Sequence, residues 1–348
     1  MAIAAFFISI VLSAGLVMLL RRSTLAERSL DRPNRRSLHV QPTPRIGGMA
    51  ILLAVAITLA ILRPGHLPFA SLLLAAILAL VSILDDRAHL PVALRLPVHV
   101  AAATLLALSW LKAFADIETA GHAEIMFTWL TSPYTAFALI LAICWMTNLF
   151  NFMDGADGLA GGMAVIGFGG YAIAAAMQPT GPSLAMVAAA MSGAALGFLF
   201  FNFPAGRVFM GDAGSVPIGF MAAAMDIQGS LMGLWPWWFG VLAFSPFIVD
   251  ATVTLLKRIL RRQKIWEAHR EHYYQRLILS GWSHRQTVLS YYFLMLGSTG
   301  SALALQNSHL LYPIVGCWVI TYTTLLLYLE WRFYQHQKDQ TEDTPGVQ

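Results

Sequence analysis

Five aspartate residues lie at the ends of apolar stretches in a chain that has few charged residues. Of its 348 residues, 57% are hydrophobic and 11% are charged, whereas soluble domains contain about 25% charged residues. A buried carboxylate is costly unless it is paired with a cation or a hydrogen-bond donor. The sequence therefore predicts an acidic, metal-competent site at a lipid–water boundary, formed by Asp85, Asp86, Asp154, Asp157 and Asp212.

Residues 148–158 place amides and carboxylates at three-residue steps, as Asn148, Asn151, Asp154 and Asp157. Their oxygen atoms suit Mg²⁺, and they also accept hydrogen bonds from a uracil imide or a ribose. A helix cap followed by a turn is the structural alternative, because Asp and Asn favour both positions. Four such groups in one loop without lysine or arginine favour the functional interpretation.

Residues 204–215 form a second acidic loop, in which Asp212 follows Gly211 and opens another apolar stretch. This position presents a carboxylate to a metal ion, and the amides at the start of the following helix can bind a phosphate. Phe209 either stacks on a base or holds the loop at the membrane interface, and this loop taken alone favours the second interpretation.

An acidic pair, Asp85 and Asp86, ends a third apolar stretch. One carboxylate of such a pair can face a metal ion while the other faces a proton or a substrate. The alternative is a solvated helix end, although the helix dipole disfavours acids at a C-terminus. Arg95 and His99 lie four residues apart and form either a cationic face for a phosphate or a structural pair at the interface.

Basic residues gather in two loops. The loop 257–286 is expected to lie beside anionic lipid. Within it, the histidine and arginine side chains suit a phosphate clamp better than a zinc site, because the arginines repel a cation. In the other loop, the turn of residues 42–48, which contains Arg45, is more specific than membrane orientation requires. The clamp residues are His269, Arg270, His272 and Arg276.

About 20 apolar residues are needed to cross a bilayer core. The sequence predicts an all-α, polytopic membrane protein with about 11 transmembrane helices in a single domain, 1–334, followed by a polar and disordered tail, 335–348. Asp250 lies inside a span and is expected to pair with a loop arginine, whereas Asp226 has no assigned role. The predicted spans are 2–20, 47–63, 68–84, 97–113, 130–147, 159–178, 183–203, 216–233, 235–256, 287–305 and 310–330.

The distribution of basic residues predicts the orientation. With the N-terminus outside and the C-terminus in the cytoplasm, 20 of the 22 lysine and arginine residues lie on the cytoplasmic side, as the positive-inside rule requires. This orientation also brings all five aspartates to the cytoplasmic face.

Six motifs together resemble one family, the polyprenyl-phosphate N-acetylhexosamine-1-phosphate transferases of glycosyltransferase family 4. The resemblance extends over nearly the whole chain, and it is specific only when the motifs are taken together. They are DRPNRRSLH at 31–39, PTPRIGG at 42–48, LDDR at 84–87, NLFNFMDGADGLAGG at 148–162, FNFPAGRVFMGDAGS at 201–215 and HREHYYQRL at 269–277.

The resemblance implies roles for individual residues. Asp85 and Asp86 match the catalytic acidic pair of the family, and Asp212 matches its metal ligand. Asn202 matches an asparagine beside the metal, and Phe209 matches an aromatic residue that stacks on uracil. The run that contains Asn151, Asp154 and Asp157 matches the nucleotide site, and Arg45 and Arg95 stand where relatives carry basic residues.

The resemblance also implies a reaction and its partners. The substrates are a UDP-N-acetylhexosamine and undecaprenyl phosphate, and the products are the lipid-linked sugar diphosphate and UMP. The cofactor is Mg²⁺, with Mn²⁺ as a substitute. The location is the bacterial inner membrane, with the active site facing the cytoplasm, membrane lipid around it and a homodimer as a further partner; no nucleic acid is expected.

One departure from the family pattern concerns the donor sugar. Relatives carry a histidine cluster where this chain has His272, Tyr273, Tyr274 and Gln275. This difference resembles the branch that starts O-antigen chains, whose donors include UDP-FucNAc and UDP-QuiNAc as well as UDP-GlcNAc. Tyr274 and Gln275 are expected to contact a 6-deoxy sugar.

A membrane transporter or flippase is the competing function class. Many apolar spans with acidic residues are compatible with it, but transport sites usually lie near the membrane midplane. The acids of this chain lie at one edge of the spans, which favours an enzyme.

Overall fold

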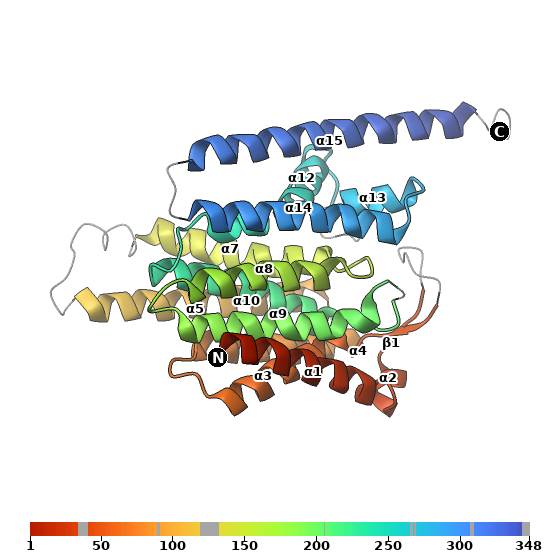
Figure 1. The fold of residues 1–348 in the computed structure, drawn as a ribbon. Coiled ribbons are helices and arrows are strands. Elements are labelled where there is room, and N and C mark those ends of the chain that lie inside the picture. Colours follow the sequence, from red (N-terminus) through yellow and green to blue (C-terminus); the bar gives the residue numbers. More distant parts are fainter. Residues whose placement is uncertain are drawn as a thin grey trace.

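The computed structural model describes residues 1–33, 41–88, 91–118, 132–204, 206–264, 267, 269–306 and 310–342. Helices dominate these residues and lie side by side in a bundle (Figure 1). The helices are α1 (Ala2–Leu20), α2 (Thr24–Arg28), α3 (Gly47–Leu62), α4 (Phe69–Ala88), α5 (Val92–Glu118), α7 (Pro133–Phe152), α8 (Leu159–Ala176), α9 (Pro182–Asn202), α10 (Asp212–Leu231), α11 (Phe239–Ala243), α12 (Ser245–Leu260), α13 (Tyr273–Leu279), α14 (His284–Leu305) and α15 (Leu311–Glu342). Two short antiparallel strands, β1 (Leu30–Asp31) and β2 (Thr43–Pro44), lie before α3.

The prediction of an all-α, polytopic membrane protein is confirmed. Among the described residues, eight helices are long and apolar enough to cross a membrane, namely α1, α4, α5, α7, α8, α9, α14 and α15. The three remaining predicted spans, 47–63, 216–233 and 235–256, correspond to the shorter α3, to α10 and to the pair α11 and α12.

The predicted spans 235–256 and 216–233 differ from the other predicted spans, each for its own reason. The span 235–256 is divided at Phe244, where α11 ends and α12 begins. Helix α10 instead lies inside the bundle, packed against α3, α4, α7 and α8. Nearly every residue of α10 from Ala213 to Met225 is buried. Its partners are therefore protein side chains, so it tolerates polar residues that a lipid-facing helix would not.

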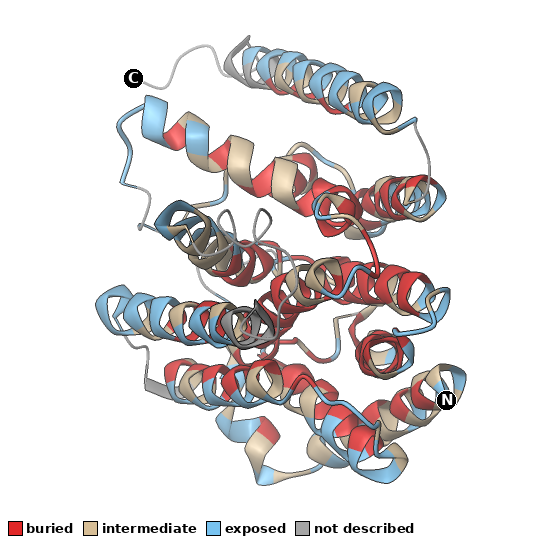
Figure 2. Cartoon of the chain, turned by 90° about the vertical axis from the view of Figure 1, so that its left-hand side faces the viewer, coloured by how far each residue is buried: buried red, intermediate tan, exposed pale blue. Residues whose placement is uncertain are grey.

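Glycines allow α1 to pack closely against α9. A Cβ atom on Gly193 would collide with the backbone oxygen of Phe6, and one on Gly197 would collide with that of Ile10. Small residues at a four-residue spacing permit such close approach of membrane helices. The buried residues gather in the central helices, whereas the helix that leads to the C-terminus is mostly exposed or intermediate (Figure 2).

Several element boundaries differ from the predicted spans. Helix α7 continues to Phe152, so Asn148 and Asn151 belong to a helix rather than to a loop. Helix α10 already begins at Asp212, which lies in its first turn. Helix α15 continues to Glu342, so residues 335–342 of the expected disordered tail are helical, and residues 343–348 lie outside the described residues.

The two acids inside predicted spans receive structural partners. The Asp226 carboxylate accepts hydrogen bonds from the Gly240 amide (2.9 Å) and the Trp235 indole (3.2 Å), which fixes the turn before α11. The prediction that Asp250 pairs with a loop arginine is wrong. Its carboxylate accepts hydrogen bonds from the backbone amides of Tyr273 (2.9 Å) and Tyr274 (3.1 Å), at the start of α13.

Candidate active site

Four helix ends bring the predicted acids together. Helices α4 and α7 end where α5 and α10 begin, toward the right of Figure 1, and we call this the acidic end of the bundle. Asp85 and Asp86 lie near the end of α4, Asn151 in the last turn of α7 and Asp212 in the first turn of α10. Residues separated by more than 120 positions in the sequence thus share one site.

Two arginines lie between the carboxylates. The Arg95 guanidinium is 2.7 Å from Asp85 Oδ2 and 3.3 Å from Asp212 Oδ2. The Arg45 guanidinium is 3.2 Å from Asp86 Oδ1 and 2.9 Å from Asp31 Oδ2. Burial acts to lower the pKa of Arg45, but the carboxylates of Asp31 and Asp86 outweigh it and raise this pKa above its usual value. Arg45 therefore stays charged at the acidic end.

The first turn of α10 holds the carboxylates of Asp86 and Asp212 near each other. Asn151 Nδ2 donates to Asp212 Oδ1 (2.9 Å) and to Ser215 Oγ (3.0 Å). The Ala213 amide, at the N-terminus of α10, donates to Asp86 Oδ2 (3.3 Å). Free amides at a helix start favour negative charge, which places these two acids at an electrostatically favourable position.

Gly211 is required by this arrangement. Its φ of 72° lies in the left-handed region that glycine adopts without strain. A Cβ atom there would also lie 3.2 Å from Asp86 Oδ2 and 3.0 Å from Arg45 Cβ. A larger residue would therefore displace the Arg45–Asp86 pair.

Backbone hydrogen bonds join the 42–48 turn to the loop before α10. The Phe209 amide donates to the Pro44 carbonyl (2.9 Å), and the Gly47 amide donates to the Phe209 carbonyl (2.9 Å). A Cβ atom on Gly48 would collide with the backbone of Gly214, so these glycines permit the contact. The pairing explains why the turn is more specific than membrane orientation requires, because it positions Arg45 beside Asp86.

Asn202, which is predicted to lie beside the metal ion, forms hydrogen bonds with the backbone of two loops. Its Oδ1 accepts a hydrogen bond from the Gly158 amide (2.6 Å), and its Nδ2 donates to the Val208 carbonyl (2.9 Å). Both ends of the side chain are thus engaged by backbone, and the residue is buried. Asn202 therefore connects the 148–158 loop to the 204–215 loop, and its proximity to a metal ion stays a prediction.

The two acids of the 148–158 loop lie in different surroundings. Burial and then the negative charges of Asp212 and Asp86, opposed by Arg45, raise the pKa of Asp154 well above its usual range. The negative charges of Asp86 and Asp212 therefore act on the Asp154 carboxyl group. Asp157 lies instead beside Gly206, where a Cβ atom would come within 2.5 Å of its carboxylate oxygen.

A cavity of about 300 Å³ opens among these groups, and we call it the acidic cavity. Asp85, Arg95, Asn151 and Asp212 line one part of it, and His269, His272 and Gln275 line another. Burial and then the positive charges of His272 and Arg258 lower the pKa of His269 to about 4. His269 is therefore neutral at neutral pH and adds no positive charge to the cavity.

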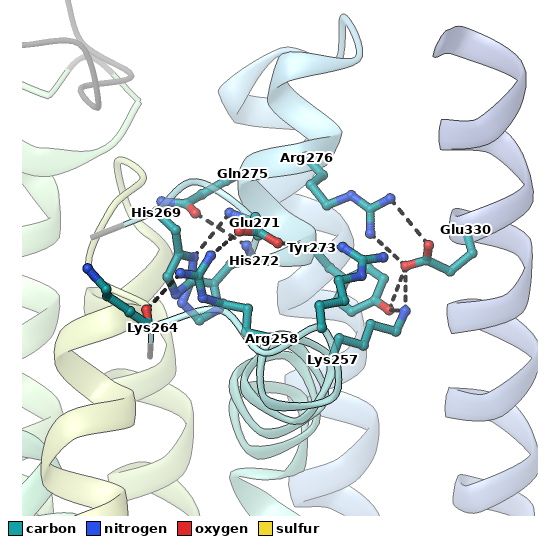
Figure 3. A network of polar contacts seen from close by, with 11 residues as sticks. Lys257, Arg258, Lys264, His269, Glu271, His272, Tyr273, Gln275, Arg276 and Glu330 are labelled. Atoms are coloured by element: carbon teal, nitrogen blue, oxygen red, sulfur yellow. Dashed lines mark hydrogen bonds and ion pairs between the residues drawn. The ribbon is translucent and has the colours of Figure 1, made fainter. Parts of the chain in front are cut away.

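The predicted phosphate clamp is divided between two cavities. His272 lines the acidic cavity, and its Nδ1 lies 3.3 Å from Asp250 Oδ1. Arg270 and Arg276 line a separate cavity on the side of α15. Figure 3 shows Arg276 directed at Glu330 of α15, while His272 and His269 lie on the other side of the network. The structure therefore brings only the histidines of the clamp to the acids.

Tyr274 also lies apart from the acidic cavity. Its side chain is fully buried, its hydroxyl donates to the Phe152 carbonyl (3.0 Å), and a Cβ atom on Gly155 would collide with it. Tyr274 thus packs against the 148–158 loop at Phe152 and Gly155. Its neighbour Gln275 lines the acidic cavity. Of the pair expected to contact a sugar, only Gln275 is placed to do so.

Two residues at the site, Ser215 and Asp31, were not predicted from the sequence. Ser215 accepts a hydrogen bond from Asn151, and Asp31 pairs with Arg45. Ser215 lies three residues after Asp212, a spacing that puts both on one helix face. Asp31 precedes arginines in the first motif, and its distant partner could not be read from that motif.

The acidic end has the donor chemistry for a divalent cation. The carboxylates of Asp85, Asp86, Asp154 and Asp212 outnumber the guanidinium groups of Arg45 and Arg95, and their mutual repulsion contributes to the raised pKa of Asp154. Within the described part of the chain, no three acidic, histidine or cysteine residues are grouped to ligate one ion. Mg²⁺ is commonly held by one or two carboxylates together with water and substrate phosphates, so the residues present suit such a site.

Comparison with known proteins identifies similar sequences. The model of a family described as glycosyl transferase family 4 matches residues 68–230. A protein of Bacillus subtilis (strain 168), named probable undecaprenyl-phosphate N-acetylglucosaminyl 1-phosphate transferase, is 30% identical over 326 residues, which cover 88% of this chain and 85% of that protein.

Two further relatives come from other bacteria. The undecaprenyl-phosphate alpha-N-acetylglucosaminyl 1-phosphate transferase of Escherichia coli O157:H7 is 27% identical over 343 residues, covering 92% of this chain and 88% of the relative. The decaprenyl-phosphate N-acetylglucosaminephosphotransferase of Mycobacterium leprae (strain TN) is 28% identical over 294 residues, covering 75% of this chain and 72% of the relative.

Proposed function

Because the chain belongs to glycosyl transferase family 4, we propose that it transfers N-acetylhexosamine 1-phosphate from a UDP-sugar to undecaprenyl phosphate and releases UMP. The observation that carries this proposal is the acidic cavity, in which carboxylates from α4 and α10 face Arg95 and Asn151 at the ends of membrane helices. A phosphate at the end of a lipid and a water-soluble diphosphate can meet only at such a boundary.

In the proposed reaction, an oxygen of the lipid phosphate attacks the sugar-side phosphorus of the donor. The bond from this phosphorus to the oxygen shared with the UMP phosphate breaks, and UMP leaves with that oxygen. Phosphoryl transfer depends mainly on positioning and on stabilising charge. The site therefore has to hold two anionic groups in line, which requires cationic groups beside the carboxylates.

Arg45 and Arg95 are the cationic side chains that would hold these phosphates. Each is oriented by a carboxylate of the acidic pair, Arg45 by Asp86 and Arg95 by Asp85. A phosphate monoester has a second pKa of about 6, so the acceptor is mostly a dianion at neutral pH. A general base would gain little, and we assign the pair to orientation and to cation binding, with proton acceptance as a secondary role.

Asp212 and one carboxylate of the pair would hold Mg²⁺, with Mn²⁺ as a substitute. When bound, the metal would neutralise the diphosphate and the leaving UMP. Asn151 keeps Asp212 Oδ1 directed into the site. Asp154 and Asp157 would bind the nucleotide by accepting hydrogen bonds, and Phe209 would stack on uracil.

The donor is a UDP-N-acetylhexosamine, and UDP-GlcNAc, UDP-FucNAc and UDP-QuiNAc are the candidates. The names of the relatives support GlcNAc. Gln275, which lines the acidic cavity where the family pattern has histidine, supports a 6-deoxy donor and a role in starting O-antigen or a related surface polysaccharide. We place the acidic end on the cytoplasmic side of the bacterial inner membrane.

The decisive experiment measures UMP release from this panel of UDP-sugars by the purified protein, with and without undecaprenyl phosphate. We expect release to require the acceptor and Mg²⁺ and to favour one donor. In a second arm, Gln275→His should shift the donor preference, while Gln263→His, an exposed position outside the cavity, should leave it unchanged. UMP release that is independent of the acceptor would refute the transferase proposal.

A further inference from the structure

A second cavity at the acidic end has the opposite charge. It has a volume of about 620 Å³ and lies among α12, α13 and α15. Lys257, Arg261, Arg270 and Arg276 line it, together with the acids Glu271 and Glu330. Four basic side chains thus face two acidic ones, and we call this space the basic pocket.

Two of the four cations of the basic pocket, Lys257 and Arg276, are held in place around Tyr273 and Glu330 (Figure 3). The Glu330 carboxylate accepts hydrogen bonds from Arg276 (2.6 Å), Lys257 (2.6 Å) and the Tyr273 hydroxyl (2.8 Å). The Arg276 guanidinium also lies 4.0 Å from the ring centre of Phe333. These contacts order the inner part of the pocket before any ligand arrives.

The outer part of the basic pocket keeps positive charge available to a ligand. The Arg261 side chain is 58% exposed, and its nearest acidic partner, Glu271, is 3.7 Å away. Arg270 is exposed as well. Exposed ion pairs at such distances contribute little energy, so an anion can replace Glu271 at Arg261 with little loss.

An apolar groove of about 510 Å³ adjoins the basic pocket, and Tyr273 lines both. The groove runs between α14 and α15, and its walls include Leu289 and Phe293 of α14 and Leu325 and Leu329 of α15. Both helices are apolar and long enough to cross a membrane. The groove therefore extends from the level of the basic residues toward the depth of the hydrocarbon.

We propose that an anionic phospholipid of the surrounding membrane binds here, with its phosphate group in the basic pocket and an acyl chain in the apolar groove. The two neighbouring spaces, one polar and one apolar, share Tyr273 as a wall and match the two parts of such a molecule. The excess of basic residues selects a negative headgroup. A free phosphate would occupy only the basic pocket. A zwitterionic lipid has no net negative charge and would gain less from the basic residues. The proposal goes beyond the transferase reaction and does not depend on it.

The test uses the full-length protein in detergent micelles and measures bound lipid by native mass spectrometry. Long-chain phosphatidylglycerol, long-chain phosphatidylcholine and inorganic phosphate are titrated separately. We expect phosphatidylglycerol to bind at least about tenfold more tightly than phosphatidylcholine, since one basic residue near the surface contributes about fivefold. Inorganic phosphate should fail to compete at equal concentration.

A matched pair of variants locates the site. Arg261→Gln should weaken phosphatidylglycerol binding about fivefold, because Arg261 lines the basic pocket. Arg262→Gln is the control, since this neighbour is equally exposed but is not among the lining residues of the basic pocket. Thermal unfolding of both variants checks that each is folded.

Three results would overturn the proposal. Equal affinity for phosphatidylglycerol and phosphatidylcholine would remove the selectivity for negative charge. Equal losses in Arg261→Gln and Arg262→Gln would indicate non-specific attraction to the helix end. Displacement of phosphatidylglycerol by an equal concentration of undecaprenyl phosphate would assign the site to that lipid instead.

Discussion

Two groups of buried carboxylates in this protein differ in how their charge is balanced. Asp250 accepts hydrogen bonds from the amides of Tyr273 and Tyr274, from the Tyr291 hydroxyl and from Thr254. It also lies 3.3 Å from His272 Nδ1. This carboxylate is saturated by donors that belong to the fold, and it holds the start of α13 against α12 and α14.

The carboxylates of the acidic end lie close enough to influence one another. Asp86 of α4 accepts a hydrogen bond from the first turn of α10, which contains Asp212. Burial and the negative charges nearby raise the pKa of Asp154. Arg45 and Arg95 form ion pairs with Asp86, Asp85 and Asp212 in this cluster. The comparison teaches that burial alone does not mark a functional acid. A carboxylate that accepts several hydrogen bonds from the fold stabilises structure, whereas neighbouring carboxylates that repel one another favour the binding of a cation.

The largest effect should follow from Asp212→Asn. Metal binding contributes several kcal/mol of transition-state stabilisation, so loss of this ligand should lower turnover by about 10³-fold or more, even at high Mg²⁺. Thermal stability should stay unchanged or rise, because one of the crowded charges is removed. UMP release and thermal unfolding of the purified variant measure the two quantities.

A second readout separates metal binding from catalysis. Mg²⁺ should raise the midpoint of thermal unfolding of the unaltered protein and leave that of Asp212→Asn unchanged. Retained activity, or a retained response to Mg²⁺, would remove Asp212 from the metal site.

The next largest effect is expected for Asp250→Ala, in which thermal stability should fall more than turnover. A buried donor left without an acceptor costs about 1–3 kcal/mol, and the Tyr273 amide, the Tyr274 amide and the Tyr291 hydroxyl would all lose theirs. We expect a large fall in the unfolding midpoint and a smaller loss of turnover at low temperature. A variant that is as stable as the unaltered protein but inactive would place Asp250 among the functional acids and break the comparison.

The smallest effect is the dependence of stability on pH. Since the pKa of Asp154 is raised on folding, the folded protein binds more protons than the unfolded chain between the usual carboxyl pKa of about 3.9 and the raised value. Stability without metal should therefore rise as pH falls through that range and decrease as pH increases through the raised pKa. The expected change in the unfolding midpoint is ~2 °C for each kcal/mol.

Asp154→Asn tests the origin of this pH dependence. The variant removes the titrating group, so the midpoint measured between pH 8 and pH 5 should change less than in the unaltered protein. An identical pH dependence in both proteins would assign the effect to another acid of the cluster.

Much of the fold could be predicted because apolar length is a local property. Each of the eight membrane-length helices overlaps a predicted span. The boundaries were less predictable, since polar residues such as Asn151 and Asp212 lie within helices whose ends are covered by other elements. Local hydropathy assigns such residues to loops.

The acidic cluster could be predicted from residue types at span ends, but the partners of individual residues could not. Asn202 bonds to two backbone groups in different loops, and Tyr274 packs beneath the 148–158 loop. Arg276 turns toward Glu330, 54 positions away. Such assignments depend on tertiary contacts, and spacing along the sequence contains no information about them.

The backbone pairing between the 42–48 turn and the loop before α10 has a consequence for biosynthesis. The Pro44 carbonyl and the Gly47 amide find their partner in Phe209, which the ribosome adds 165 residues after Pro44. At about 5–20 residues per second, that interval is roughly 8–33 s. The 42–48 turn therefore reaches its final backbone pairing, and with it the position of Arg45, only after the loop before α10 has been made.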